Sequence, residues 1–218
     1  MARARSWKGL ATEQINPRSA RLDRLGIARV VGLMQAEDRR VLTALRGARK
    51  AIVAAAEAFA DTFRSGGTCY FFGAGTSGRL AVIEAAELPP TFGTDPQRVR
   101  AVIAGGHGAV FRAREGAEDR YGEGSRSANR CRRGDLAIGV SASSVTPFVS
   151  GALERARRLG AKTVLVTASR SPGIEKVADV VVRLDTGPEV VAGSTRLKAG
   201  TATKLALNQI TTSAFASS

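Results

Sequence analysis

The chain has 218 residues, 44% of them hydrophobic and 24% charged, which fits a globular protein with one sizeable core or at most two small ones. No apolar run reaches the roughly 18 residues of a membrane span, and the basic start lacks the apolar core of a secretory signal, so we expect a cytoplasmic protein without a membrane partner. The net charge of +14 comes mainly from scattered arginines without interleaved aromatic residues, which favours a solvated surface that attracts small anions over a nucleic-acid partner.

The first third of the chain reads as an arm followed by helix. Residues 1–25 contain polar and turn-forming residues with little periodicity. From Ile27 to Phe63, apolar residues recur at three-to-four spacing, which predicts helix. Helix-stop residues follow at 65–67, Ser-Gly-Gly. We therefore expect residues 1–65 to form an N-terminal arm and helices that pack on the core or against a second copy.

Residues 66–218 alternate between strand and helix patterns. The expected strands, rich in Val and Ile, are 68–73, 99–106, 135–143, 162–169 and 178–185. The expected helices are 77–87, a short helical region at 109–120, 147–159 and 195–212. We expect Pro89 and Pro90 to stop the first of these helices. The pattern predicts an α/β domain with a doubly wound parallel sheet of five strands, preceded by the N-terminal helices.

A glycine-rich turn, GAGTSGR at 73–79, follows the first strand. Ligands of a parallel sheet collect at the carboxyl ends of its strands, and a helix N-terminus there directs N–H groups at an anion. The spacing matches G-x-G-x-x-G, which is typical of dinucleotide sites. However, Thr76 and Ser77 suit a terminal phosphate better, and no acidic residue ends the next strand to bind a ribose. We expect Gly75, Thr76 and Ser77 to bind a phosphorylated ligand, although a ligand-free turn would read the same way.

Two further loops carry hydroxyl groups to the same sheet edge. The first leads from strand to helix, and we expect it to bind ligand through Ser141, Ser143, Ser144 and Thr146, since one hydroxyl would suffice as a helix cap. The second starts the last helix and joins hydroxyls with two cations; its expected ligand-binding residues are Ser194, Arg196 and Lys198. Taken alone, the sequence of either loop fits a capped helix without a ligand as well as it fits a ligand-binding loop. Three such loops in one sheet favour a ligand.

Carboxylates follow the glycine turn and the second strand. Glu84 and Glu87 lie three apart and share a helix face. Glu115 and Glu118 form a second group. Two carboxylates from different segments beside a bound sugar can act as general base and general acid, although any single one reads equally well as surface charge.

The sequence offers few cysteine and histidine residues that could bind a metal ion. The two cysteines, Cys69 and Cys131, are far apart, which disfavours a disulfide framework or a zinc site. The one histidine, His107, cannot form a histidine cluster, and it reads as a loop residue or a ligand contact. We expect no bound metal.

Six stretches closely resemble the N-acetylmuramic acid 6-phosphate etherase family: TEQINPRS, GAGTSGRL, ELPPTFGTDP, IAGGH, EGAED and GPEVVAGSTRLKAGTATK. The resemblance runs from about Thr12 to Thr212. It implies the sugar isomerase (SIS) fold, which the related glucokinase regulatory protein shares. It also implies a homodimer, no metal or organic cofactor, and a phosphorylated amino sugar as the partner. Members usually continue as a C-terminal helical part, which we do not expect within these residues.

The resemblance implies a lyase of cell-wall sugar recycling. Such enzymes cleave the D-lactyl ether of N-acetylmuramic acid 6-phosphate by elimination and then hydration, giving N-acetylglucosamine 6-phosphate and D-lactate. Glu87 matches the base in the motif E-x-P-P, and Glu118 matches the second acid/base in G-A-E-D. The glycine turn and the hydroxyl loop then receive the phosphate, with Glu115 among the substrate-binding residues.

Three positions depart from the family pattern. Ser144 and Val145 stand where the family usually has glycine and arginine, and Leu88 stands where cysteine is typical. Losing a cation beside an anionic substrate leaves a second interpretation open, that of a sugar-phosphate-binding regulatory protein with weak or no catalysis. An aldose–ketose isomerase on the same fold is a third.

Overall fold

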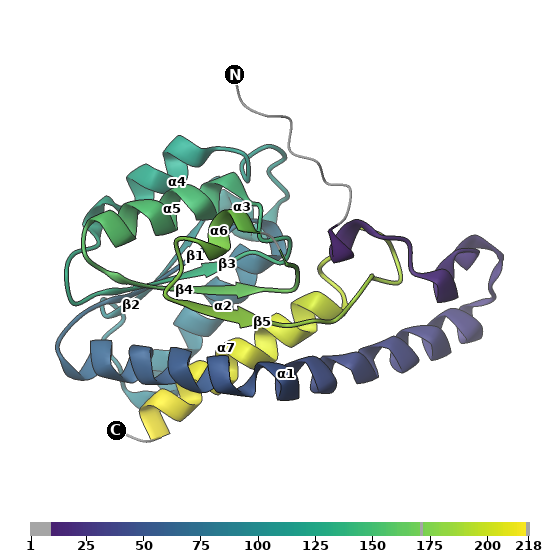
Figure 1. The fold of residues 1–218 in the computed structure, drawn as a ribbon, viewed down its shortest axis with the longest axis horizontal. Helices are drawn as coiled ribbons and strands as arrows, with labels where there is room; N and C mark the ends of the chain where they lie inside the picture. The colour runs from purple at the N-terminus through teal and green to yellow at the C-terminus, as the bar shows by residue number, and fades with distance from the viewer. Residues whose placement is uncertain (1–9, 171, 217–218) are drawn as a thin grey trace.

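Five parallel strands form one sheet in the computed structural model, which describes residues 10–170 and 172–216 (Figure 1). Their order across the sheet is β2-β1-β3-β4-β5. The strands are β1 Cys69–Gly73, β2 Val99–Ile103, β3 Leu136–Val140, β4 Lys162–Thr167 and β5 Val180–Arg183. The predicted fold class, an α/β protein with a five-stranded parallel sheet, is confirmed.

The register aligns the ends of the three strands that precede the expected site. Gly73, the last residue of β1, lies opposite Ile103 of β2 on one side and Val140 of β3 on the other. Each of these residues also ends its own strand. The segments that follow β1, β2 and β3 therefore leave the sheet at one edge, where parallel sheets receive ligands.

Helices cover both faces of the sheet, and side chains alternate between the two resulting cores. Phe71 and Ile138 point into the core formed with α1, α2 and α7, whereas Phe72 and Leu165 point into the core formed with α5 and α6. The helices are α1 Ile27–Arg64, α2 Gly75–Phe92, α3 Gly108–Phe111, α4 Tyr121–Ser127, α5 Pro147–Arg158, α6 Pro172–Glu175 and α7 Lys198–Ala216. Figure 1 shows both helical layers.

Helix α1 is one continuous helix of 38 residues, about 57 Å long at 1.5 Å per residue. Its second half packs along α7 and the sheet, and its first half extends beyond the sheet (Figure 1). It ends as the sequence predicts, with Ser65 as C-cap and Gly66 in the left-handed conformation at φ 82°. Large apolar side chains on α1 stay exposed, among them Ile27 at 85% and Leu42 at 56%.

The prediction that two prolines stop the second helix is wrong. Helix α2 runs through Pro89 and Pro90 to Phe92 and ends at Gly93, whose φ is 65° and whose N–H donates to the carbonyl oxygen of Pro89. Proline has a helical φ and removes only its own N–H donor while crowding the preceding turn. Because this last turn lies at the surface, with Pro90 exposed, the helix can continue through it.

Two other helical predictions need correction. Within 109–120, only the end of α3 is helical, and residues 112–120 form turns and bends in which Gly116 has φ 73°. The last helix begins at Lys198 and extends to Ala216, later at both ends than the expected 195–212.

The described part of the arm consists of three short 3-10 turns, η1 Ala11–Glu13, η2 Pro17–Ser19 and η3 Leu22–Arg24. A fourth, η4, spans Ala128–Arg130. Residues 1–9 of the predicted arm lie outside the described residues. Within residues 10–170 and 172–216, no helix combines the length and apolarity needed to cross a bilayer.

Candidate active site

A cavity of about 300 Å³ opens where β1, β2 and β3 end. Its lining comes from the glycine turn, the segment after β2, the loop between β3 and α5, the loop before α7, and the arm. The lining residues are Glu13, Ala74, Gly75, Thr76, Ser77, Arg79, Ala104, Ala109, Ala113, Arg114, Glu115, Ala117, Glu118, Ala142, Ser143, Thr146, Gly193 and Thr195. The three loops expected to share a ligand therefore each contribute to one cavity.

The glycine turn presents the start of α2 to the cavity. A Cβ on Gly73 would come 2.7 Å from the nitrogen of Gly78, so these two glycines allow the end of β1 and the first turn of α2 to touch backbone to backbone. Gly75 begins α2 with φ 53°. The N–H groups of the first helical turn have no partner within a helix. With the Thr76 and Ser77 hydroxyls they form a set of donors suited to an anion.

The loop between β3 and α5 brings two more hydroxyls, Ser143 and Thr146, to the cavity. Ser141 is buried beneath, and its hydroxyl lies 2.7 Å from that of Thr146, which it orients. Ser144 is fully buried with φ 60°, a conformation that favours glycine, and its hydroxyl has no hydrogen-bond partner among the described residues. Of this loop, Ser143 and Thr146 can contact a ligand directly.

The charged lining combines carboxylates with guanidinium groups. Glu118 is half-buried and Glu115 exposed, both on the non-helical segment before α4. Arg114 packs over the turn at Gly105, and Arg79 of α2 donates from Nε to the carbonyl oxygen of Val110 at 2.8 Å. An anionic ligand would meet two cations here, and these two carboxylates line the same cavity.

Besides Ser141 and Ser144, which are buried in their loop, four predicted site residues do not line the cavity. Glu87 is exposed on α2, twelve residues after Gly75 and so about 18 Å along the helix axis. Arg196 is exposed and Ser194 half-buried in the loop before α7, without lining the cavity. Lys198 is 1% exposed, and its ammonium binds Glu37 Oε2 at 2.5 Å.

Three charged lining residues were not predicted: Glu13, Arg79 and Arg114. Each lies within or beside a quoted motif, TEQINPRS, GAGTSGR or EGAED. For Arg79 and Arg114 the signal was available, since each neighbours a residue already expected at the site. Glu13 had no such signal, because its place in the cavity depends on contacts of residues 12 and 13 with the distant Gly193.

The other carboxylate of α2, Glu84, is buried and faces away from the cavity into the helical layer. It accepts hydrogen bonds from Asn208 Nδ2 at 2.8 Å and from the Thr211 hydroxyl, both on α7. Burial raises the pKa of Glu84, against these hydrogen bonds and the charge of Lys204, which lower it. Glu84 therefore joins α2 to α7 and does not contact a ligand in this cavity.

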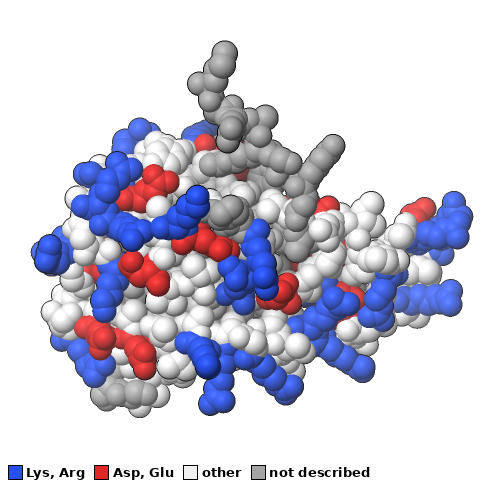
Figure 2. All heavy atoms as spheres, in the orientation of Figure 1, with Lys and Arg blue, Asp and Glu red and all other residues white. Residues whose placement is uncertain are grey.

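Charge on the outer surface is mixed. Figure 2 shows Lys and Arg side chains spread over one face of the molecule, with Asp and Glu side chains between them. Among the residues that the structure describes, no group of three or more His, Cys, Asp or Glu side chains is placed to hold a metal ion.

Comparison with known proteins identifies the family. A family model described as the glucokinase regulatory protein N-terminal SIS domain matches residues 51–157. The N-acetylmuramic acid 6-phosphate etherase of Gloeobacter violaceus is 49% identical over 94% of this chain and 68% of its own length.

Solved structures establish the fold. A phosphoheptose isomerase from Francisella tularensis superposes with a TM-score of 0.68 at 16% identity, over 89% of this chain and all of its own. The Vibrio vulnificus NanR protein, complexed with ManNAc-6P, gives 0.59 at 16% identity, over 85% of this chain and 64% of its own. The resemblance seen in the motifs is confirmed, and the chain belongs to the N-acetylmuramic acid 6-phosphate etherase family.

Proposed function

We propose that this chain is an etherase that cleaves the D-lactyl ether of N-acetylmuramic acid 6-phosphate, releasing D-lactate and N-acetylglucosamine 6-phosphate. Relatives with this name cover almost the whole chain at 43–49% identity. The observation that supports the proposal is the cavity, which is lined both by Glu118 and by the hydroxyl and N–H donors of the glycine turn. A solved SIS-fold neighbour, the Vibrio vulnificus NanR protein, is complexed with ManNAc-6P, also a phosphorylated amino sugar.

The donors and the carboxylate suit different parts of this substrate. Thr76, Ser77, Ser143 and Thr146 offer hydroxyls, and the start of α2 offers N–H groups, so we assign them the phosphate. Val145 adds no cation where the family has arginine, but Arg79 and Arg114 line the cavity and can attract the anion.

Glu118 is assigned to the reacting end of the opened sugar. The aldehyde acidifies the neighbouring C2 proton, which a carboxylate can remove. As the C2–C3 double bond forms, the C3–O bond breaks, and lactate leaves with the electron pair and takes a proton from a general acid. Water then adds at C3 and gives one proton to the conjugate base of that acid, and the proton taken from C2 returns to C2. Each step needs a positioned acid or base, and Glu118 serves as one of the two.

Glu87, which its motif matches to the base, fits this scheme only in the cavity of a second copy. It lies about 18 Å along α2 from the phosphate donors of its own chain, further than a hexose phosphate extends. Ile83, four residues before Glu87 on the same helix face, is 51% exposed, and Phe111 of α3, which packs beside α2, is 77% exposed. A homodimer that covers this face would bury them and carry Glu87 to the partner's sugar.

The direct test is D-lactate release from N-acetylmuramic acid 6-phosphate by the purified chain. We expect release by the wild type and a loss of about 10²–10⁴ in kcat for Glu118→Gln, the usual contribution of a general acid or base. Glu123→Gln, which removes a carboxylate from α4 outside the cavity, is the matched control. Sugar-phosphate binding without release would instead favour the regulatory protein, and ketose formation would favour the isomerase.

Mixing two inactive variants tests the placement of Glu87. If Glu87 acts on the partner's sugar, unfolding and refolding Glu87→Gln together with Glu118→Gln restores one intact site in each mixed dimer, about a quarter of wild-type activity. If both carboxylates act within one chain, mixing restores nothing. Sedimentation of the wild type as a stable monomer would contradict the dimer outright.

Since a charged sugar phosphate does not cross a bilayer unaided, we propose that the reaction takes place in the cytoplasm.

A further inference from the structure

The N-terminal arm puts a carboxylate into the cavity that the family motifs leave without a role. Glu13, the last residue of η1, lines the same cavity as Thr76 and Glu118. The backbone fixes its place: the N–H of Gly193 donates to the carbonyl oxygen of Thr12 at 2.9 Å. A Cβ on Gly193 would come 3.1 Å from Glu13 Oε2, so this glycine leaves room for the carboxylate.

The Glu13 carboxylate has hydrogen-bonding capacity to spare. Within the described part of the chain it receives one long hydrogen bond, from the Thr12 hydroxyl at 3.4 Å, and no Lys or Arg nitrogen lies within 4.0 Å of it. An ionised carboxylate accepts about four hydrogen bonds. Its remaining capacity is therefore open to a ligand in the cavity.

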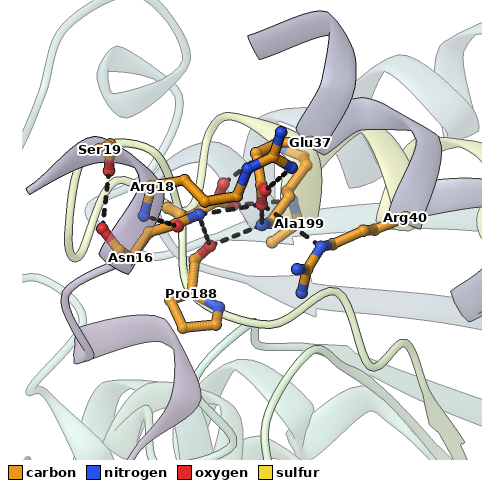
Figure 3. Close-up of polar contacts among 9 residues, drawn as sticks. Asn16, Arg18, Ser19, Glu37, Arg40, Pro188 and Ala199 are labelled. Carbon is orange, nitrogen blue, oxygen red and sulfur yellow. Dashed lines mark hydrogen bonds and ion pairs between the residues drawn. The ribbon is translucent and has the colours of Figure 1, made fainter. Parts of the chain in front are cut away.

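A buried polar network three residues further on holds the arm in place (Figure 3). Asn16 is 4% exposed, and its Nδ2 donates to Glu37 Oε2 at 2.9 Å and to the carbonyl oxygen of Pro188 at 3.2 Å. Arg18 pairs with Glu37 Oε1 at 3.0 Å, and Lys198 pairs with Glu37 Oε2. Figure 3 shows Asn16 and Arg18 turned toward Glu37, so the arm is joined to α1 and to the loop before α7 at one point.

We propose that Glu13 binds the amino sugar by accepting a hydrogen bond from a ring or chain hydroxyl or from the amide N–H, and that Asn16 positions it. The proposal rests on the proposed function. A carboxylate repels both anionic groups of the substrate, the phosphate and the lactyl carboxylate. Glu13 therefore faces the neutral donors between them, where a charge-assisted hydrogen bond favours a polyhydroxylated sugar over a deoxygenated one.

The kinetics of D-lactate release test the proposed hydrogen bond between Glu13 and the amino sugar. For Glu13→Ala we expect KM to rise about tenfold or more while kcat stays within about threefold, as for a binding contact kept through the reaction. Asp23→Asn removes an exposed carboxylate from η3 of the same arm and should leave both constants unchanged. A KM for Glu13→Ala within about twofold of the wild type overturns the proposal.

A double-mutant cycle tests the positioning role of Asn16. We expect Asn16→Ala to raise KM by about three- to tenfold in the wild type and to have no further effect in the Glu13→Ala background. An equal effect in both backgrounds means that Asn16 acts on the fold in general and overturns its role.

If the wild type releases no lactate, the proposed function fails, and the contact is measured by calorimetry with N-acetylglucosamine 6-phosphate. Weaker binding by Glu13→Ala than by Asp23→Asn would support the contact. Equal binding, or no binding even by the wild type, would overturn it.

Discussion

The backbone N–H of Phe148 donates a hydrogen bond of 2.9 Å to the carbonyl oxygen of Glu118. Phe148 lies in the first turn of α5, where N–H groups have no partner within the helix. Glu118 lies in the non-helical segment that leads into α4. This bond attaches the backbone of a proposed acid/base residue to the helix end that carries the hydroxyl loop, so the packing of α4 on α5 controls the spacing within the cavity.

That packing depends on the absence of a side chain at Gly124 of α4, where a Cβ would come 1.9 Å from the carbonyl oxygen of Phe148. We expect Gly124→Ala to lower the free energy of unfolding by about 2 kcal/mol and to reduce lactate release. In the same helix, a Cβ on Gly122 meets its nearest atom, Arg126 Nη1, at 3.5 Å. Gly122→Ala should stabilise by up to about 1 kcal/mol. Urea denaturation measures the stability of both variants. Equal free energies of unfolding for Gly124→Ala and Gly122→Ala would contradict the close contact between α4 and Phe148.

Ser144 holds a left-handed conformation, at φ 60°, that costs a non-glycine residue about 1–2 kcal/mol. Its buried hydroxyl lacks a partner within the described residues, which adds to the cost. We expect Ser144→Gly to raise the free energy of unfolding by about 1 kcal/mol after the entropy cost of glycine. Ser143→Gly, at the preceding position without positive φ, should lower it by about 0.5–1 kcal/mol. If Ser144→Gly unfolds at a lower temperature than the wild type, the backbone at Ser144 is not strained.

Lys198 is buried with its ammonium bound to Glu37 Oε2 and to the carbonyl oxygen of Pro188 at 2.6 Å. Removing one partner of a buried ion pair leaves the other charge uncompensated, so we expect Lys198→Met to cost about 3 kcal/mol in urea denaturation. Asn16 and Arg40 still contact Glu37 and keep the cost from rising further. Lys204→Met, at an exposed position of the same helix, should stay within about 0.5 kcal/mol of the wild type. Similar losses in both variants would argue against the ion pair.

Glu84 makes stability depend on pH, because burial raises the pKa of its carboxyl in the folded state. From the unfolded pKa of about 4.3 up to the folded pKa, the folded state binds more protons, so the free energy of unfolding falls as pH rises. Glu84→Gln lacks this titration. The stability of the wild type relative to the variant should therefore be greatest below about pH 4.3 and decline toward neutral pH. Glu57→Gln, on the exposed face of α1, is the control for removing one negative charge. If the free energies of unfolding of the wild type and of Glu84→Gln change with pH in parallel, the pKa of Glu84 is not raised in the folded state.

The sheet could be predicted because its signals are local. Val- and Ile-rich runs such as 162–169 separate amphipathic segments, and a parallel sheet is the arrangement that buries such strands on both faces. The end of α2 could not be predicted from its prolines alone. Whether a proline ends a helix depends on the exposure of the crowded turn, and Pro90 lies at the surface.

For the site, the topology was the useful guide. Once β1 and β3 are expected to be parallel, Thr76 and Thr146 must follow them at one edge, and both line the cavity. Glu13 could not be inferred in this way. Its place depends on tertiary contacts such as that of Asn16 with Pro188, which no periodicity in the sequence reports.

These contacts also set an order of assembly. Asn16 and Pro188 are 172 residues apart, and Glu37 and Lys198 are 161 apart, so each contact closes a loop of most of the chain. On the ribosome the arm emerges before the sheet, yet its docking site does not exist until the start of α7 has been made. Such long-range closures are slow compared with local helix formation. The arm is thus made early but takes its native place late, and the arm side of the cavity is completed after the sheet beneath it.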